Sequence, residues 1–222
     1  MKIKRIIDLT QSFCEKGFNN PAFRDGSMTV VMEHKNAGWY AEEINTATHV
    51  GTHIDAPLHK IRGGKPINAY PLERFIGDGV PINLYDKKEN EEITAKDFIS
   101  YDSVIQKGDN VLLCTGWAER KKEESKDTYL HASPWLGASA CRYLVGKGVN
   151  SVGIDHFSIG GANSEHVEIP HDLLLHRDIL IIEGLYLPRQ LFERERWTLI
   201  AFPLLMEYAS GSPARVAAVE WE

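Results

Sequence analysis

Three histidines and an aspartate occur within the thirteen-residue stretch THVGTHIDAPLHK, which begins at Thr48. The four side chains are those of His49, His53, Asp55 and His59. Neutral imidazole and carboxylate are ligands that Zn²⁺ and Mn²⁺ both accept, and a set of three protein ligands leaves one position for water. The residue types and their spacing therefore predict a divalent metal site that activates water.

The local conformation determines whether these side chains can converge. The residues between them, among which are Gly51 and Pro57, are poor helix formers, so we expect an extended segment. Side chains alternate in an extended chain, which places His49, His53 and Asp55 on one face, with a gap at Gly51. Pro57 should end the strand, so His59 can turn toward the open metal position instead of joining the ligands.

The rest of the chain predicts the elements that must position this segment. Apolar runs predict strands at 3–9, 80–85, 109–117, 150–155, 179–186, 197–205 and 214–221. Helices are expected after Thr94, with Asp97 at its third position, after Ser133-Pro134 as far as Gly146, and over 169–178. Strands outnumber helices, which predicts an α/β fold with mixed sheets and few helices.

Two segments are expected to be irregular. Residues 10–43 are rich in Asn, Gly, Pro and charge, which indicates a long loop that contains a hairpin. The charge run at 119–127 is typical of a surface loop. Asp155 is the last residue of the strand predicted at 150–155, where it either orients the site or caps a turn.

The composition limits the function classes. A chain of 222 residues with 43% hydrophobic and 25% charged residues fits one globular domain over 1–222. The net charge of −6 disfavours nucleic-acid binding. The three cysteines form no CxxC pair, and no apolar run is long enough to span a membrane. The early polar residues do not fit a signal peptide, so we expect a cytoplasmic protein.

The stretch HVGTHIDAPLH resembles the HxGTHxDxPxH motif of the cyclase family of metal-dependent hydrolases, which includes bacterial kynurenine formamidases and isatin hydrolases. The segments IDLTQ, VGIDHFSI, PHDLLL…ILIIEGL and PLLMEYASGSPARVAAV also resemble this family. The resemblance covers almost the whole chain and is weakest between Gln11 and Ala47. It implies the swivelling β/β/α-type fold of that family.

The resemblance also implies one or two metal ions per chain, with Zn²⁺ as the first choice and Mn²⁺ as the alternative. His49, His53 and Asp55 would hold the first ion, while Asp55, His171 and Glu183 would hold the second. From the residues alone, Glu183 could instead pair with Arg177, and His171 could be a surface residue at a helix end. His59 matches the acid/base histidine of the family.

The implied activity is hydrolysis of an amide C–N bond by metal-activated water, with His59 moving the proton. A small aryl formamide or cyclic amide is the expected substrate, and a homodimer or homotetramer the expected assembly. The aromatic residues Phe18, Phe23, Trp39 and Tyr40 either line the substrate pocket or pack their loop onto the core. The chain carries NNPAFRDGS where kynurenine formamidases carry a Trp-Pro-Gly-Asp-like segment. Ring opening of a lactone or an isatin-type substrate, and an inactive metal-binding protein, are therefore kept as alternatives.

Overall fold

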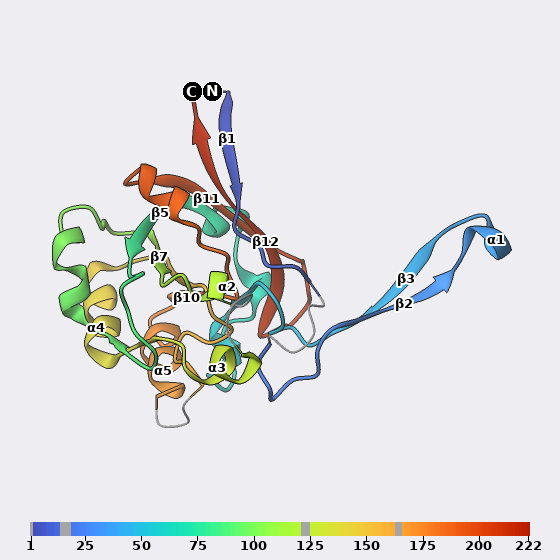
Figure 1. Ribbon diagram of the computed structural model, residues 1–222, viewed down its shortest axis with the longest axis horizontal. Helices are drawn as coiled ribbons and strands as arrows, with labels where there is room; N and C mark the ends of the chain where they lie inside the picture. The colour runs from blue at the N-terminus through green and yellow to red at the C-terminus, as the bar shows by residue number, and fades with distance from the viewer. Residues whose placement is uncertain (1, 14–18, 121–124, 163–165) are drawn as a thin grey trace.

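A mixed β-sheet that closes into a barrel forms the centre of the computed structural model (Figure 1). The structure describes residues 2–13, 19–120, 125–162 and 166–222. Over these residues the sheet has eight strands, seven of which form the closed ring. The ring order is β12 (Gly211–Trp221), β11 (Trp197–Pro203), β5 (Ile76–Asn83), β7 (Asn110–Cys114), β9 (Ser151–Ile154), β10 (Leu180–Glu183), β4 (His53–Asp55) and back to β12.

Strand directions confirm the mixed character predicted from the sequence. Strands β5, β7, β9 and β10 run parallel to one another, whereas β11, β12 and β4 pair antiparallel with their neighbours. Strand β5 begins at Ile76, earlier than the predicted 80–85, because its first residues pair with β11. Strand β1 (Ile3–Asp8) pairs with the far end of β12, so the two ends of the chain lie side by side (Figure 1).

Alternate residues of the barrel strands pack into two hydrophobic clusters. Leu112 and Ile182 belong to a cluster that joins opposite strands across the barrel interior. Val111 and Ile181 belong to a second cluster outside the barrel, which α4 (Ala138–Lys147) and α5 (Glu168–Leu175) cover. Side chains therefore point inward or outward according to the two-residue period of a strand. This rule fixes the face on which each polar side chain of β4 and β10 lies.

The predicted helix ends are only partly correct. Thr94 and Asp97 form the expected capping box, although the segment they begin is the 3-10 helix η4 (Ala95–Tyr101). The helix predicted to start at Ser133-Pro134 begins instead at Ala138. Residues 135–136 form the short strand β8 (Trp135–Leu136), which pairs with β6 (Glu92–Ile93), so a non-local contact overrides the local signal. The other 3-10 helices are η1 (Pro57–His59), η2 (Ile67–Ala69), η3 (Leu72–Phe75) and η5 (Arg189–Glu193).

The described ends of the charge run include helical residues. Helices α2 (Trp117–Arg120) and α3 (Lys126–His131) occupy its two sides, while 121–124 lie outside the described residues. The indole N–H of Trp117 donates to the carbonyl of Tyr129 in α3, and Tyr129 itself is buried. Lys126 and Asp127, the part of the predicted loop that lies in α3, are exposed as predicted but helical. Among the helices of the described residues, none has the length and apolar content to cross a membrane.

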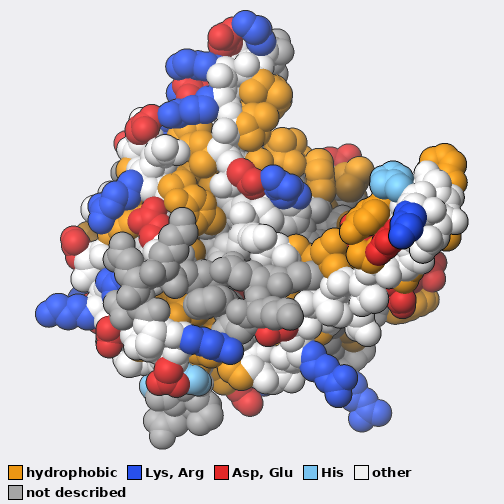
Figure 2. Space-filling model, turned by 45° about the vertical axis from the view of Figure 1, so that its right-hand side comes forward, with side chains coloured by type: hydrophobic (Ala, Val, Ile, Leu, Met, Phe, Trp, Pro, Cys, Tyr) orange, Lys and Arg blue, Asp and Glu red, His pale blue; other side chains and the backbone are white. Residues whose placement is uncertain are grey.

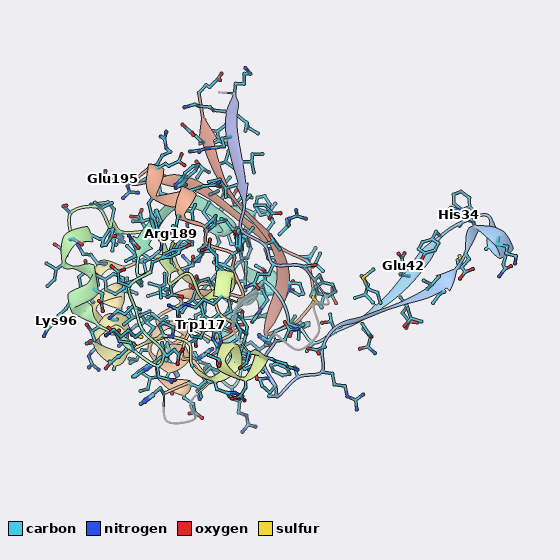
Figure 3. The ribbon with its side chains drawn as sticks, viewed as in Figure 1. His34, Glu42, Lys96, Trp117, Arg189 and Glu195 are labelled. Carbon is cyan, nitrogen blue, oxygen red and sulfur yellow. The ribbon has the colours of Figure 1, made fainter. Side chains whose placement is uncertain are left out.

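A hairpin projects from the barrel within the long N-terminal segment (Figure 1). It consists of β2 (Ser27–Met32), the short helix α1 (His34–Ala37) and β3 (Ala41–Asn45), and confirms the predicted hairpin. His34 and Glu42 mark how far it reaches (Figure 3). Met28 faces Ile44 on one side of the hairpin, whereas Thr29 faces Glu43 on the other. Met28 and Ile44 are exposed, and hydrophobic side chains are visible along the arm (Figure 2).

Candidate metal centre

Strand β4 lies between β10 and β12 and places two of the predicted ligands. Ile54 packs into the interior cluster, so His53 and Asp55 point to the outer face of the barrel. The antiparallel register sets Glu183 of β10 directly opposite His53. Ile182 points inward, so Glu183 lies on the same outer face as His53. Strand pairing alone therefore brings a histidine and a glutamate together.

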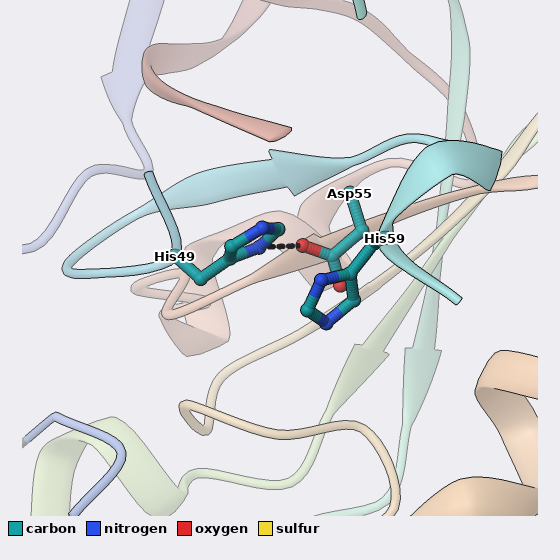
Figure 4. A group of neighbouring side chains, drawn as sticks. All are labelled: His49, Asp55 and His59. Carbon is teal, nitrogen blue, oxygen red and sulfur yellow. Dashed lines mark hydrogen bonds and ion pairs between the residues drawn. The ribbon is translucent and has the colours of Figure 1, made fainter. Parts of the chain in front are cut away.

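His49 reaches the site by a different route from the one predicted. The segment before β4 is a turn, not a strand, and Gly51 adopts the left-handed region at φ +70°. The expected alternation from His49 to His53 is therefore wrong, since Gly51 serves to turn the chain and does not leave a gap for a ligand. The turn carries the His49 ring back onto Asp55, where Nδ1 lies 2.7 Å from Oδ1 (Figure 4).

Two further histidines approach from separate elements. His59 ends the 3-10 helix η1, which begins at Pro57, and its ring stacks on that of His49 with centroids 3.8 Å apart (Figure 4). His171 lies on α5, is almost buried, and donates from Nδ1 to the Val167 carbonyl. The second nitrogen of His171, Nε2, then faces Asp55 and Glu183. His171 is thus not a surface residue.

Asp55 is the common neighbour of the whole group. His53 Nε2 lies 3.4 Å from Asp55 Oδ1 and 3.4 Å from Glu183 Oε2. His171 Nε2 lies 3.6 Å from Asp55 Oδ2 and 3.4 Å from Glu183 Oε1. Ligand atoms within 4.8 Å of one another form two sets, which are His49, Asp55, His59 and His53, Asp55, Glu183. All six residues singled out in the sequence therefore meet at one place.

The charges of this group depend on one another. Burial would raise the pKa of Asp55, but the neighbouring imidazoles of His171, His49 and His53 hold it well below its ordinary value. Burial would lower the pKa of His53, but the carboxylates of Asp55 and Glu183 raise it to about 10. The same two carboxylates raise the pKa of His171. Two buried carboxylates therefore require positive charge beside them.

The donor atoms fit a divalent cation. His53 Nε2 and Asp55 Oδ2 are both buried and have no hydrogen-bond partner, although such atoms are rarely left without one. His53 donates from its other nitrogen to the Gly51 carbonyl at 2.8 Å, which fixes the ring with Nε2 toward the carboxylates. Metal-binding histidines are commonly held in this way by a hydrogen bond from the second ring nitrogen. Imidazole and carboxylate together suit Zn²⁺ or Mn²⁺.

A small cavity of about 180 Å³ opens beside the cluster. His49, His59, His171 and Glu183 line one side of it, and the rings of Phe23 and Phe157 add apolar surface. At the edge, the ammonium of Lys60 lies 2.9 Å from Glu168. Burial lowers the pKa of His59, with the nearby His49 and His171 acting in the same direction and Asp55 and Glu183 against it. His59 is therefore neutral and faces a space that can hold a small molecule.

Several residues of the site were not predicted. Ser210 Oγ lies 2.8 Å from His49 Nε2, and a Cβ at Gly211 would lie 2.6 Å from the His49 ring, so only glycine fits there. The segment SGSP is part of the resemblance to the family, which predicts no role for Ser210 or Gly211. Phe157 and Ser158 also line the cavity; they lie in the segment VGIDHFSI, whose resemblance to the family assigned no role to either residue.

Other predicted residues have different places. Asp155 accepts hydrogen bonds from the backbone N–H groups of Thr115 and Trp117, so it holds the turn after β7. Of the N-terminal aromatic residues, Phe23 reaches the cavity, whereas Trp39 and Tyr40 are exposed on the hairpin. Phe18 lies outside the described residues.

Comparison with known proteins agrees with this geometry. The family model described as "Putative cyclase" matches residues 7–160, which is more than half of the chain. A kynurenine formamidase of Geobacillus thermodenitrificans is 33% identical over 177 residues, covering 79% of this chain and 78% of that protein. A kynurenine formamidase of Bacillus cereus is 29% identical over 216 residues and 97% of each chain.

Solved structures show the same fold. Isatin hydrolase A from Labrenzia aggregata superposes with a TM-score of 0.85 at 25% identity, covering 98% of this chain and 94% of that one. The barrel with few helices is therefore a fold that this chain shares with isatin hydrolase A over nearly its full length. The finer assignment to a swivelling β/β/α type stays a prediction.

Proposed function

The chain belongs to the cyclase family, and on that premise we propose that it is a metal-dependent hydrolase that cleaves an amide C–N bond. The observation that carries the proposal is the convergence of five buried or nearly buried ligand side chains around Asp55, with His59 beside them at a cavity. An aryl formamide or a cyclic amide is the proposed substrate.

In this proposal His49, His53 and Asp55 hold a first divalent ion, and Asp55, His171 and Glu183 hold a second. Zn²⁺ is the first choice and Mn²⁺ the alternative, since both accept these nitrogen and oxygen ligands. A divalent ion there supplies Lewis acidity, which lowers the pKa of water and polarises a carbonyl group. His49 must release either Asp55 or Ser210 to bind, because both of its ring nitrogens are hydrogen-bonded.

His59 is proposed as the acid/base residue. Its ring lines the cavity and is neutral at pH 7 because burial lowers its pKa, so a ring nitrogen can accept a proton from the attacking water. The same nitrogen then returns the proton to the nitrogen that leaves the substrate. His49, stacked beneath it, keeps the imidazole plane facing the cavity.

The substrate class rests on the cavity and on the relatives. Phe23 and Phe157 supply flat apolar faces for an aromatic ring, and about 180 Å³ suits a small molecule. The relatives named above are kynurenine formamidases and an isatin hydrolase, which favours an aryl formamide or a cyclic amide. Ring opening of a lactone or an isatin-type substrate is the second candidate. An inactive metal-binding protein is the third, and His59 in the cavity disfavours it.

We also propose that the chain forms a homodimer or homotetramer through the hairpin. One face of the hairpin carries exposed Met28, Val30 and Ile44, with Glu42 opposite Val30 on the same face. At its base, Ile44 borders a larger cavity of about 770 Å³ whose other apolar walls include Phe202 and Leu204. Contiguous apolar surface of this kind marks interaction sites, and a second copy of the chain offers the matching surface.

The test of the activity uses protein loaded with Zn²⁺ or with Mn²⁺, and a pH-stat that follows acid release. The substrates are formanilide, isatin and dihydrocoumarin, which represent a formamide, a cyclic amide and a lactone. We expect acid release from formanilide that requires the metal and disappears in Asp55→Asn, whereas turnover of isatin without formanilide would favour the ring-opening alternative. Turnover of dihydrocoumarin alone would favour the lactone alternative, and a metal-loaded protein inert toward all three would contradict the proposal.

A further inference from the structure

Ser158 carries a buried hydroxyl that no group in the described part of the chain satisfies. The residue is 2% exposed, and its Oγ has no hydrogen-bond partner. Burying a hydroxyl in this way costs free energy, because the bonds it made with water in the unfolded chain are not replaced. Nearly all other buried side-chain polar atoms of the described residues are paired.

Ser158 lies where its hydroxyl can contact a molecule bound in the small cavity. Ser158 lines the small cavity together with His59, His171 and Glu183. The remaining unpaired atoms near it, His53 Nε2 and Asp55 Oδ2, belong to the proposed metal ligands. Ser158 is not placed to join them as a ligand, since a neutral hydroxyl is not among the groups that Zn²⁺ or Mn²⁺ prefers.

The backbone around Ser158 is held firmly on both sides. The N–H of Ile159 donates to Glu183 Oε1 at 2.7 Å, and the N–H of Gly184 donates to the His156 carbonyl at 2.7 Å. The carbonyl of Ser158 accepts from the N–H of Gly161 at 3.1 Å. The side chain therefore turns about one bond on a fixed backbone, and its hydroxyl can reach a ligand in the cavity without a loop movement.

Most of the other polar side chains at the cavity are engaged with one another. Lys60 and Glu168 pair with each other, and the histidines and Glu183 belong to the cluster around Asp55. Carboxylate acceptors are abundant next to the cavity, and the neutral donors that line it are the Ser158 hydroxyl, the Asn20 amide and the His59 imidazole. Of these three residues only Ser158 is buried, and its hydroxyl has no partner among the described residues. A neutral donor suits an uncharged oxygen and has no particular preference for an anion.

We propose that Ser158 is a specificity-determining residue whose hydroxyl donates a hydrogen bond to the carbonyl oxygen of a neutral amide. The inference rests on the proposed function and deepens it, because it selects amides and lactams over charged acids. In the free protein the hydroxyl is unsatisfied, and the ligand supplies its partner.

The experiment measures binding and stability, not turnover. The probes are 2-indolinone, a neutral lactam, and indoline-2-thione, in which sulfur replaces the carbonyl oxygen. Titration calorimetry with zinc-loaded protein gives the Kd of each for the wild type and for Ser158→Ala. We expect the substitution to weaken 2-indolinone binding by about tenfold and thione binding by less than about twofold, because sulfur is the poorer acceptor.

Thermal unfolding gives a second readout. Ser158→Ala removes an unpaired buried hydroxyl, so we expect the Tm of the ligand-free protein to stay the same or rise. The control is Ser151→Ala on β9, a buried serine whose Oγ donates to Asn110 at 2.7 Å. That control should lower the Tm and leave the Kd of 2-indolinone unchanged. Ser158→Cys, which keeps the shape and weakens the donor, should give an intermediate Kd.

Three results would overturn the inference: no binding of 2-indolinone by the wild type, equal Kd values in wild type and Ser158→Ala, or equal losses for both probes. A fall in Tm like that of Ser151→Ala would also overturn it, since it would show a purely structural role. Hydrolysis of formanilide by the wild type, measured in parallel, separates the two proposals. If formanilide is hydrolysed and the Kd values are equal, the proposed function stands and the role of Ser158 fails.

Discussion

His53 and Glu183 lie directly opposite each other on the antiparallel strands β4 and β10, with His53 Nε2 and Glu183 Oε2 3.4 Å apart. The two residues are far apart in the sequence, and only the register of the pairing between β4 and β10 brings them together. A slip of one residue in this pairing would move Glu183 to the barrel interior. The precision of the site therefore depends on the hydrophobic residues Ile54 and Ile182, which hold the register.

Replacing Glu183 should reduce metal binding without unfolding the protein. In Glu183→Gln the second proposed ion loses its only ligand carboxylate besides Asp55, and we expect the metal content to fall by about one atom per chain. Elemental analysis of purified protein measures this. The control is Glu195→Gln, an exposed glutamate (Figure 3), which should keep the full content. Equal metal content in both variants would remove Glu183 from the ligand set.

Replacing His59 should separate proton transfer from metal binding. In His59→Ala we expect kcat to fall on the order of 100-fold or more, with metal content unchanged, because the proposed function assigns His59 to proton transfer and not to the ligands of the ion. The control is His176→Ala, an exposed histidine that follows α5. His59 also lies within ligand distance of His49 and Asp55. Loss of the metal in His59→Ala would therefore show that it is a ligand.

The buried His156 should make stability depend on pH. Burial lowers its pKa to about 4, since the charged ring would lose water, while His131 acts in the same direction and Glu183 against it. The unfolded chain then binds more protons than the folded chain between about pH 6.5 and pH 4. The stabilising contribution is fully present above the unfolded pKa and is lost as the pH falls through this window.

The test compares wild type with His156→Gln, which keeps hydrogen-bonding capacity but does not titrate. Urea unfolding should show that the wild type loses about 2 kcal/mol more than the variant when the pH falls from about 7.5 to about 5. A parallel fall in both proteins would mean that His156 does not carry this part of the acid sensitivity. The contacts to be preserved are those with Ser133 Oγ and with the Tyr129 carbonyl.

The hairpin should control the oligomeric state. Ile44→Lys places a charge on its apolar face, and we expect a shift toward monomer in sedimentation velocity at micromolar concentration. Thr29→Lys places the same charge on the opposite, polar face, beside Glu43, and should leave the oligomer intact. An unchanged oligomer in Ile44→Lys, or a monomeric wild type, would contradict the proposed assembly.

The sequence predicted most strands because their apolar runs are long enough to be recognised, as for β7 and β11. It also predicted that the six site residues meet, through the motif and the resemblance. It failed where a distant partner decides the outcome. Trp135 looked like the first turn of a helix, but β6 draws it into a strand pair. His49 is placed by a turn at Gly51 and by the close approach of Gly211, which no local pattern reveals.

The unpaired hydroxyl of Ser158 is a second feature that could not be predicted from the sequence. The resemblance of VGIDHFSI assigns no role to its serine, and most serine hydroxyls after a strand bond to water or to a nearby backbone group. The hydroxyl loses contact with water only when the chain folds and Glu183, His59 and Phe157 form the cavity wall around it. Only then is it without a partner. Unsatisfied groups belong to the assembled molecule, so they become visible only in three dimensions.

Strand β12 pairs with β4 through Gly211–Pro213 and so closes the ring beside His53 and Asp55. During synthesis β4 leaves the ribosome long before β12, because most of the chain separates them. Until β12 emerges, the HxGTHxD segment lacks one of its two flanking strands and the Ser210 contact to His49. Loading with a cation is therefore expected to follow translation, and a nascent chain halted before β12 should not retain it.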